Sequence, residues 1–208
     1  FFERQEIKDA LGYMRLVNHA HDDAAFERVV NTPSRGLGER TLATIREQTR
    51  LQDCSMWQAS LQLLQDGSLK GRAANALNAF IELINKLADE FEGQPLEEQA
   101  NKAINQSGLY AMYQAEKGEK AQARLENLEE LVTACKQFVI PEEADEMTPL
   151  QAFLAHASLE AGETQASGDQ DAVQLMTIHT AKGLEFPLVF IAGVEEGMFP
   201  SQMTNDEP

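Results

Sequence analysis

The chain has 208 residues, of which 43% are hydrophobic and 25% are charged, a balance typical of a folded domain rather than a disordered segment. It carries 34 Asp and Glu against 17 Lys and Arg, a formal net charge of −17, which argues against a protein that coats nucleic acid with a basic surface. Its two cysteines, Cys54 and Cys135, fit a reducing cytoplasm, without a disulfide framework or a metal site. The sequence contains no run of about 18 apolar residues, so no membrane-spanning helix is predicted.

The positive charge is concentrated near the start of the chain. Residues 1–50 hold eight of the 17 basic side chains and also eight acidic ones, so this segment is neutral overall. Residues 151–208 hold one basic and nine acidic side chains. A local patch that attracts nucleic acid is therefore compatible with the acidic total.

Apolar residues recur at helical spacing through most of the chain, beginning with the stripe from Ile7 to Val17, which predicts a mainly α protein. The helices predicted in this way cover residues 7–17, 77–91, 125–138 and 149–159. The last of them begins with Thr148-Pro149, residue types that favour the N-cap and the first helical position. Connections are expected at residues 92–95, 117–119 and 139–147.

The pattern changes after residue 160. Residues 161–171 are small and polar and predict a linker. Residues 173–179 and 188–193 are nearly continuous apolar runs, typical of strands in a sheet that is covered on both faces. Because two strands cannot bury themselves, we expect residues 172–208 to be a short α/β segment of a larger sheet. The chain, which begins at Phe1, is therefore expected to be a piece of a longer protein.

Residues 174–193 form the most specific string, Gln-Leu-Met-Thr-Ile-His-Thr-Ala-Lys-Gly-Leu-Glu-Phe-Pro-Leu-Val-Phe-Ile-Ala-Gly. A polar turn after a buried strand can present His179, Thr180, Lys182 and backbone N–H groups to a phosphate. Glu185 can accept hydrogen bonds from a sugar hydroxyl. A lone histidine or lysine is more often structural or solvated, so the prediction depends on the whole string.

A second candidate site lies at residues 31–41, Asn-Thr-Pro-Ser-Arg-Gly-Leu-Gly-Glu-Arg-Thr. Gly36 and Gly38 allow the backbone to approach a phosphate closely, and the helix predicted from Glu39 offers free N–H groups. Leu37 can anchor the turn, while Arg35, Arg40 and Thr41 can contact phosphates. None of these groups reads a base, so binding should be salt-sensitive and independent of sequence. The alternative is an ordinary helix–turn–helix corner in which glycine caps the first helix.

These strings resemble, in the same order, superfamily 1 DNA helicases of the UvrD/Rep/PcrA group. Residues 174–193 resemble motif V of that group, and residues 195–201 resemble the stretch that follows it. Residues 1–9 resemble the start of the accessory subdomain, residues 31–41 its duplex-contacting Gly-x-Gly motif, and residues 124–131 a further segment of it.

The resemblance implies two RecA-like motor subdomains, each interrupted by a helical insertion. Residues 1–160 are then the accessory insertion called 2B, residues 161–171 a linker, and residues 172–208 the return into motor subdomain 2A. The parent protein would be an ATP- and Mg²⁺-dependent helicase that moves 3′ to 5′ and acts in DNA repair and replication. The residues that the resemblance places at DNA are Arg35, Gly36, Leu37, Gly38, Arg40, Thr41, His179, Thr180 and Lys182. It places Glu185 at the nucleotide ribose. Lys8, on the first predicted helix, is a weaker candidate for a DNA contact, and a solvated charge on the helix face is an equally good interpretation.

The sequence lacks the Gly-x-x-x-x-Gly-Lys-Ser/Thr loop that cradles nucleotide phosphates. Because ATP hydrolysis also needs Mg²⁺ ligands and charge-stabilising arginines, we expect neither catalytic residues nor a bound cofactor in this chain alone. The expected partners are a single-strand/duplex DNA junction, mismatch- and excision-repair proteins, and a second copy of the chain through residues 173–193. The alternatives are an all-α adaptor that binds proteins through its acidic helices and, within the group, a Rep or PcrA helicase.

Overall fold

The computed structural model describes residues 1–161, 173, 175–178, 181–192 and 194. The chain divides into two units, Phe1–Gln165 and Ala166–Pro208, and each is described by itself. The described residues form nine α-helices and one short 3-10 helix at Glu142–Ala144, all in the first unit. The α-helices are α1 (Gln5–Asn18), α2 (Asp23–Val29), α3 (Glu39–Gln52), α4 (Met56–Gln65), α5 (Gly71–Phe91), α6 (Leu96–Gln106), α7 (Leu109–Ala115), α8 (Glu119–Gln137) and α9 (Pro149–Ala161).

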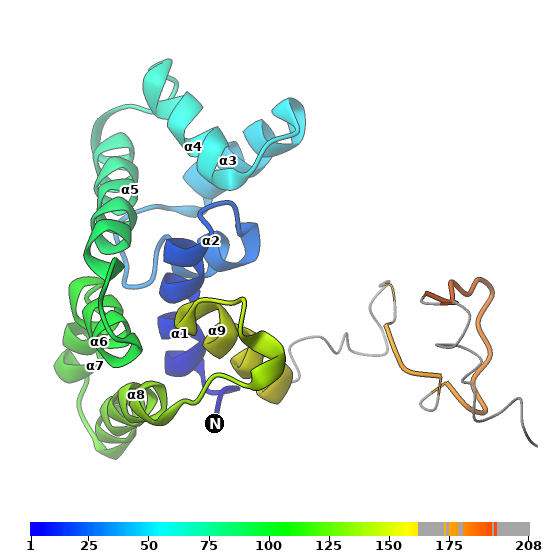
Figure 1. The fold of residues 1–208 in the computed structure, drawn as a ribbon. Coiled ribbons are helices and arrows are strands. Elements are labelled where there is room, and N and C mark those ends of the chain that lie inside the picture. The colour runs from blue at the N-terminus through cyan, green and yellow to red at the C-terminus, as the bar shows by residue number, and fades with distance from the viewer. Residues whose placement is uncertain (162–172, 174, 179–180, 193, 195–208) are drawn as a thin grey trace, which may run out of the picture. The chain divides into compact units, whose positions relative to one another are not determined.

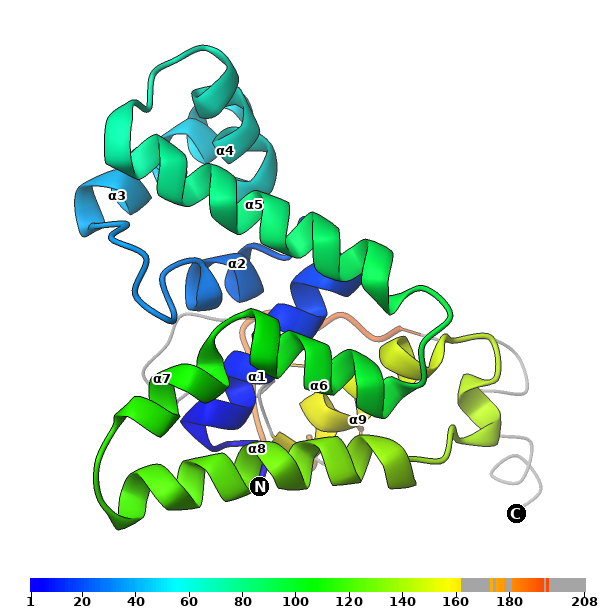
Figure 2. The same cartoon turned by 90° about the vertical axis from the view of Figure 1, so that its left-hand side faces the viewer.

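Helix α1 is the central helix of the first unit. It contacts α2, α5, α6, α7, α8 and α9, and its buried residues lie on several faces, including Ile7, Ala10, Tyr13 and Leu16. A helix that is buried on most sides belongs inside a domain. Figures 1 and 2 show the α3–α4 pair at one end of the helical unit and α8 at the other, with α5 running between these ends.

The helices predicted from apolar spacing are confirmed, since α1, α5, α8 and α9 cover the expected segments to within a few residues. The predicted start of α9 is also found in the structure. The backbone N–H of Gln151 donates to Thr148 Oγ1 at 3.2 Å, and the N–H of Thr148 donates to Gln151 Oε1 at 3.0 Å. This reciprocal pair is a capping box, which satisfies N–H groups that the first helical turn leaves free.

An aromatic cluster lies where α1, α2 and α5 meet. Phe80 packs edge-to-face against Phe26 and Tyr13, with ring centroids 5.6 Å and 6.4 Å apart. Helices α1 and α2 approach so closely that a Cβ on Gly12 would lie 2.7 Å from Val29 Cγ1. Any larger residue at position 12 would therefore force Val29, at the end of α2, to shift. The candidate turn departs from this end of α2.

The α/β part of the predicted fold is not found among the residues that the structure describes. The described residues of segments 173–179 and 188–193 form no strand, and Leu175 and Phe190 are 94% and 87% exposed. A buried strand needs hydrogen-bonding neighbours and covered faces, and the described residues of the second unit supply neither. The prediction of a mainly α protein is confirmed, whereas the expected C-terminal strands are absent from the described part of the chain.

Candidate nucleic-acid interface

The segment between α2 and α3 is fixed on its inner side. The side-chain oxygen of Asn31 accepts hydrogen bonds from the backbone N–H groups of Arg35 and Leu37, at 2.7 Å and 3.3 Å. Leu37 is 1% exposed and belongs to the core, as the sequence predicts. Gly36, in contrast, is exposed, has a φ of +79°, and has open space where a Cβ would be. The turn therefore presents Gly36 outward between two anchored residues.

The guanidinium of Arg35 points into the fold rather than away from it. Its Nη1 donates to the carbonyl oxygens of Val29 and Pro33, both at 3.1 Å. Its Nη2 donates to the Ser107 carbonyl at 3.1 Å and to the Tyr13 hydroxyl at 2.5 Å. A phosphate contact by this side chain, as expected from the sequence, would require these bonds to be broken.

Tyr13 is suited to this arrangement because it keeps its proton. The side chain is 0% exposed, and burial raises the pKa of Tyr13 to about 12, although the nearby Arg35 acts in the opposite direction. The neutral hydroxyl donates to the Thr32 carbonyl at 2.5 Å while it accepts from Arg35. Tyr13 thus links α1 to both sides of the turn.

The outer side of the turn is the start of α3. Gly38 is the N-cap and is exposed, and no side chain caps the first-turn N–H groups. These groups carry the positive end of the helix dipole. Arg40 is exposed, and Thr41 beside it is partly exposed. Glu39, which would repel an anion, is paired with Arg46 Nη1 at 2.5 Å, further along the helix.

Most of the basic side chains near the start of the chain are occupied within the fold. Six of the eight in residues 1–50 bond to other described residues: Arg4 to Asn127, Lys8 to Glu3, Arg15 to Ser158, Arg28 to Asp9, Arg35 to the groups above, and Arg46 to Glu27 and Glu39. Lys8, a predicted DNA contact, lies 2.8 Å from the Glu3 carboxylate. Arg40 and Arg50 make no such side-chain bond in the part of the chain that the structure describes. Arg40 is therefore the cation left available beside the turn.

The predicted residues of motif V lie in the second unit, where His179 and Thr180 fall outside the described residues. Lys182 and Glu185 are both exposed. Their segment is a turn in which the N–H of Ala181 donates to the Thr177 carbonyl, and the N–H of Leu184 to the Ala181 carbonyl, both at 3.0 Å. Lys182 thus lies in this turn and Glu185 directly after it, both exposed.

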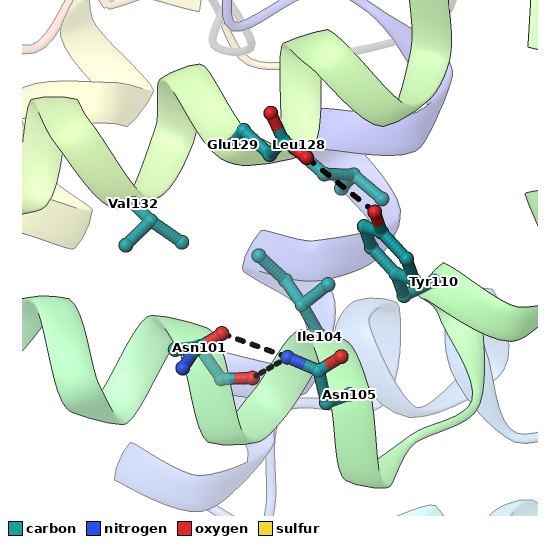
Figure 3. Close-up of a pocket in the computed structure, with 7 residues that line it drawn as sticks. All are labelled: Asn101, Ile104, Asn105, Tyr110, Leu128, Glu129 and Val132. Atoms are coloured by element: carbon teal, nitrogen blue, oxygen red, sulfur yellow. Dashed lines mark hydrogen bonds between the residues drawn. The ribbon is translucent and has the colours of Figure 1, made fainter. Parts of the chain in front are cut away.

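Sequence reasoning did not predict a pocket of about 270 Å³ between α6, α7 and α8, shown in Figure 3. Ile104, Leu128 and Val132 give it apolar walls, and Tyr110 donates a hydrogen bond to Glu129 at 3.4 Å across it. None of the predicted DNA contacts lines it. Among the described residues there is no cluster of metal-ligating side chains and no helix long and apolar enough to cross a membrane.

Comparison with known proteins decides the family. A family model described as the UvrD-like helicase C-terminal domain matches residues 1–208. The chain belongs to this family. Over 207 residues it is 62% identical to DNA helicase II of Escherichia coli (strain K12), and over 208 residues it is 59% identical to DNA helicase II of Haemophilus influenzae. It is 39% identical over 206 residues to ATP-dependent DNA helicase PcrA of Bacillus subtilis.

These matches cover 100% of the chain for the two DNA helicase II proteins and 96% for PcrA. The chain spans only 29%, 29% and 27% of the length of these relatives. The resemblance drawn from the sequence motifs is confirmed, and within the group the chain is more similar to the DNA helicase II proteins than to PcrA.

Proposed function

We propose that the chain is part of an ATP-dependent DNA helicase that moves 3′ to 5′ on single-stranded DNA and acts in repair and replication. Residues 1–160 are its 2B accessory subdomain, which contacts duplex DNA at a single-strand/duplex junction and thereby regulates unwinding. Family membership supports this proposal. The observation that carries it is the corner from Gly36 to Thr41, where an exposed turn, an uncapped helix start and an available arginine lie together.

The corner can hold a phosphate in a simple way. Gly36 and Gly38 have no side chain that would keep a DNA backbone at a distance, and the first N–H groups of α3 can donate to phosphate oxygens. Arg40 and Thr41 add a charge and a hydroxyl. Because these groups contact phosphate rather than base edges, binding is independent of sequence and weakens as salt rises. Lys8 is a weaker contact, since it would have to leave Glu3.

ATP and Mg²⁺ belong to the complete helicase in this proposal. Glu185 would accept a hydrogen bond from the nucleotide ribose, and His179, Thr180 and Lys182 would lie where DNA and nucleotide are linked. The residues of this chain do not fit the rest of the cofactor, because the sequence has no phosphate-cradling loop. The chain is therefore expected to hydrolyse no ATP by itself.

Residues 172–208 are proposed to be a segment of motor subdomain 2A, joined to the accessory subdomain by the linker 161–171. In this proposal residues 173–179 and 188–193 become strands when the other strands of the motor lie beside them. Leu188 and Phe190 are 72% and 87% exposed, so this apolar run is a surface that another chain can cover. A second copy of the chain is one such partner, and repair proteins are partners of the complete enzyme.

The contact is tested by fluorescence anisotropy with a labelled single-strand/duplex junction over a series of salt concentrations. Arg40→Ala is compared with Arg50→Ala, which removes the same charge from the far end of α3. Arg40→Ala should weaken binding. It should also make the negative slope of log K against log salt shallower by about 0.9, which corresponds to the loss of one phosphate contact. Arg50→Ala should leave both values close to those of the original chain. Equal effects of the two variants would contradict the proposed site.

A second candidate function is an all-α module that binds proteins through its acidic helices. The pocket in Figure 3 favours it, because apolar walls beside the Glu129 carboxylate suit the stem and head of a basic side chain. The junction assay separates the two candidates. An intact helical fold with no junction binding at low salt would favour the protein-binding module over the DNA contact.

A further inference from the structure

Arg35 joins three parts of the first unit that are far apart in the sequence. Its Nη2 reaches the Tyr13 hydroxyl on α1 and the carbonyl of Ser107 at the corner between α6 and α7. Its Nη1 reaches the loop after α2, at the carbonyls of Val29 and Pro33. The planar fork of an arginine donates in fixed directions, so these bonds set the position of the loop against the two helical parts.

The groups that accept hydrogen bonds from the guanidinium are neutral. The groups that accept its hydrogen bonds are carbonyls and one hydroxyl, and no carboxylate pairs with it among the described residues. The carbon at its centre lies 5.2 Å from the Phe80 ring and 5.7 Å from the Tyr13 ring, where cation–π attraction adds to the hydrogen bonds. A charge held in this way is costly to reorient toward solvent, because the carbonyls of Pro33 and Ser107 would each lose the hydrogen bond that Arg35 donates.

The same residue begins the exposed turn. The backbone N–H of Arg35 donates to the Asn31 side chain, Gly36 follows with a φ of +79°, and Leu37 returns to the core. The apex at Gly36 is thus held between the Arg35 side chain and the Leu37 side chain. The direction in which Gly38 and the first N–H groups of α3 face depends on these two anchors.

We propose that Arg35 promotes duplex binding as a positioning residue rather than as a phosphate contact. With Tyr13 and the Ser107 carbonyl it forms a latch that holds Gly36, Gly38 and Arg40 in the orientation that a DNA backbone requires. The inference rests on the proposed DNA contact at this corner, but it assigns Arg35 a role that differs from that of Arg40.

Tyr13 provides the decisive test, because it is 0% exposed and cannot touch DNA. The variants are Tyr13→Phe, Arg35→Ala and the double variant, with Arg40→Ala as comparator, all measured for junction binding over a salt series. Tyr13→Phe should weaken binding about tenfold or more, the effect of losing one hydrogen bond to a charged group. It should leave the slope of log K against log salt unchanged. The double variant should bind no more weakly than Arg35→Ala alone, because both changes break one latch.

Two results would overturn the latch. Arg35 contacts phosphate directly if Arg35→Ala makes the slope of log K against log salt shallower by about 0.9 while Tyr13→Phe binds the junction with normal affinity. If both variants melt at lower temperature but bind the junction with unchanged affinity while folded, the network serves stability alone. The proposed DNA contact itself is tested separately by Arg40→Ala. If this variant keeps the junction affinity and the salt dependence of the unsubstituted chain, the DNA contact is wrong.

Hydrogen–deuterium exchange of the free chain gives a second measurement that does not need DNA. In Tyr13→Phe the hydrogen-bonded amides of Leu37 and Thr41, which donate to the Asn31 side chain and to the Gly38 carbonyl, should exchange faster than in the unsubstituted chain. The amides of α5 and α8 should not change. Equal protection of the Leu37 and Thr41 amides in both proteins would contradict a latch that holds this turn.

Discussion

Replacement of Leu37 by alanine tests whether the turn is anchored in the core. Leu37 is 1% exposed and lies in the main apolar cluster. Truncation of a fully buried leucine costs about 2–5 kcal/mol, and the cost is highest where the site cannot collapse. Asn31 holds the N–H groups of residues 35 and 37, so the backbone cannot follow the missing side chain inward. We expect a loss of about 3 kcal/mol, which lowers the melting temperature by about 6–12 °C in a domain of this size.

The measurement is urea unfolding followed by far-ultraviolet circular dichroism, with Leu51→Ala as the matched control. Leu51 is 66% exposed, so the same truncation should change the unfolding free energy by less than about 0.5 kcal/mol. Leu37→Ala should also weaken junction binding, because the turn loses one of its two anchors. Identical unfolding midpoints for the two variants would refute the view that Leu37 anchors the turn.

Two further predictions concern the stability of the fold at acidic pH and the exposed apolar residues 188–191 of the second unit. Burial raises the pKa of Asp9 even though Arg28 lies beside it, so its stabilising effect is present at low pH and is lost as pH rises through the folded-state pKa. The free energy of unfolding is measured in urea between about pH 3 and about pH 6. Asp9→Asn should become more stable relative to the unsubstituted chain as pH rises. A difference in unfolding free energy that does not change with pH would contradict this prediction. In size-exclusion chromatography with light scattering, the chain should self-associate more than a shorter chain ending at Ala161, and equal monomeric behaviour would argue against pairing through residues 188–191.

The long helices were predictable because their stability depends on one repeated local pattern. The stripe from Leu77 to Phe91 repeats at helical spacing over four turns, and α5 covers it. Helix α7, Leu109–Ala115, has seven residues, too few to show a period, and is stabilised by packing of Leu109 and Tyr113 in the core. Periodicity therefore predicts long amphipathic helices and misses short ones that depend on their neighbours.

The conformation of the candidate turn was predictable, whereas the partners of the Arg35 side chain were not. Turn residue types locate the corner, since Gly36 adopts a positive φ and Leu37 is buried. The groups that bind the Arg35 side chain come from positions 22 and 72 residues away. An arginine next to glycine in an exposed loop is usually solvated, and no local pattern in the sequence indicates that Tyr13 lies beneath it. Only the packing of α1 against the loop brings the two together.

The strands expected in residues 173–193 are absent from the described residues of that range for a related reason. Apolar and β-branched residues indicate that a segment suits a covered sheet, but the sheet itself must be supplied by other strands. Val173 and Leu175 are 90% and 94% exposed. These apolar side chains are therefore not buried by the described residues, although their type favours burial. The sequence therefore indicates that the segment suits a strand, but the strand forms only where neighbouring strands bond to it.

In the proposed DNA contact, the net charge of −17 matters mainly because acidic residues decide which basic side chains stay available. Arg28 is paired with buried Asp9, and Arg46 with Glu39, so acidic residues neutralise basic ones that would otherwise attract DNA over a wide surface. Arg40 stays available beside an uncapped helix start. Because each neutralised phosphate contributes about 0.9 to the salt slope, a corner with one available arginine should give a small slope. A large slope for the isolated chain would mean that several of these ion pairs open on DNA.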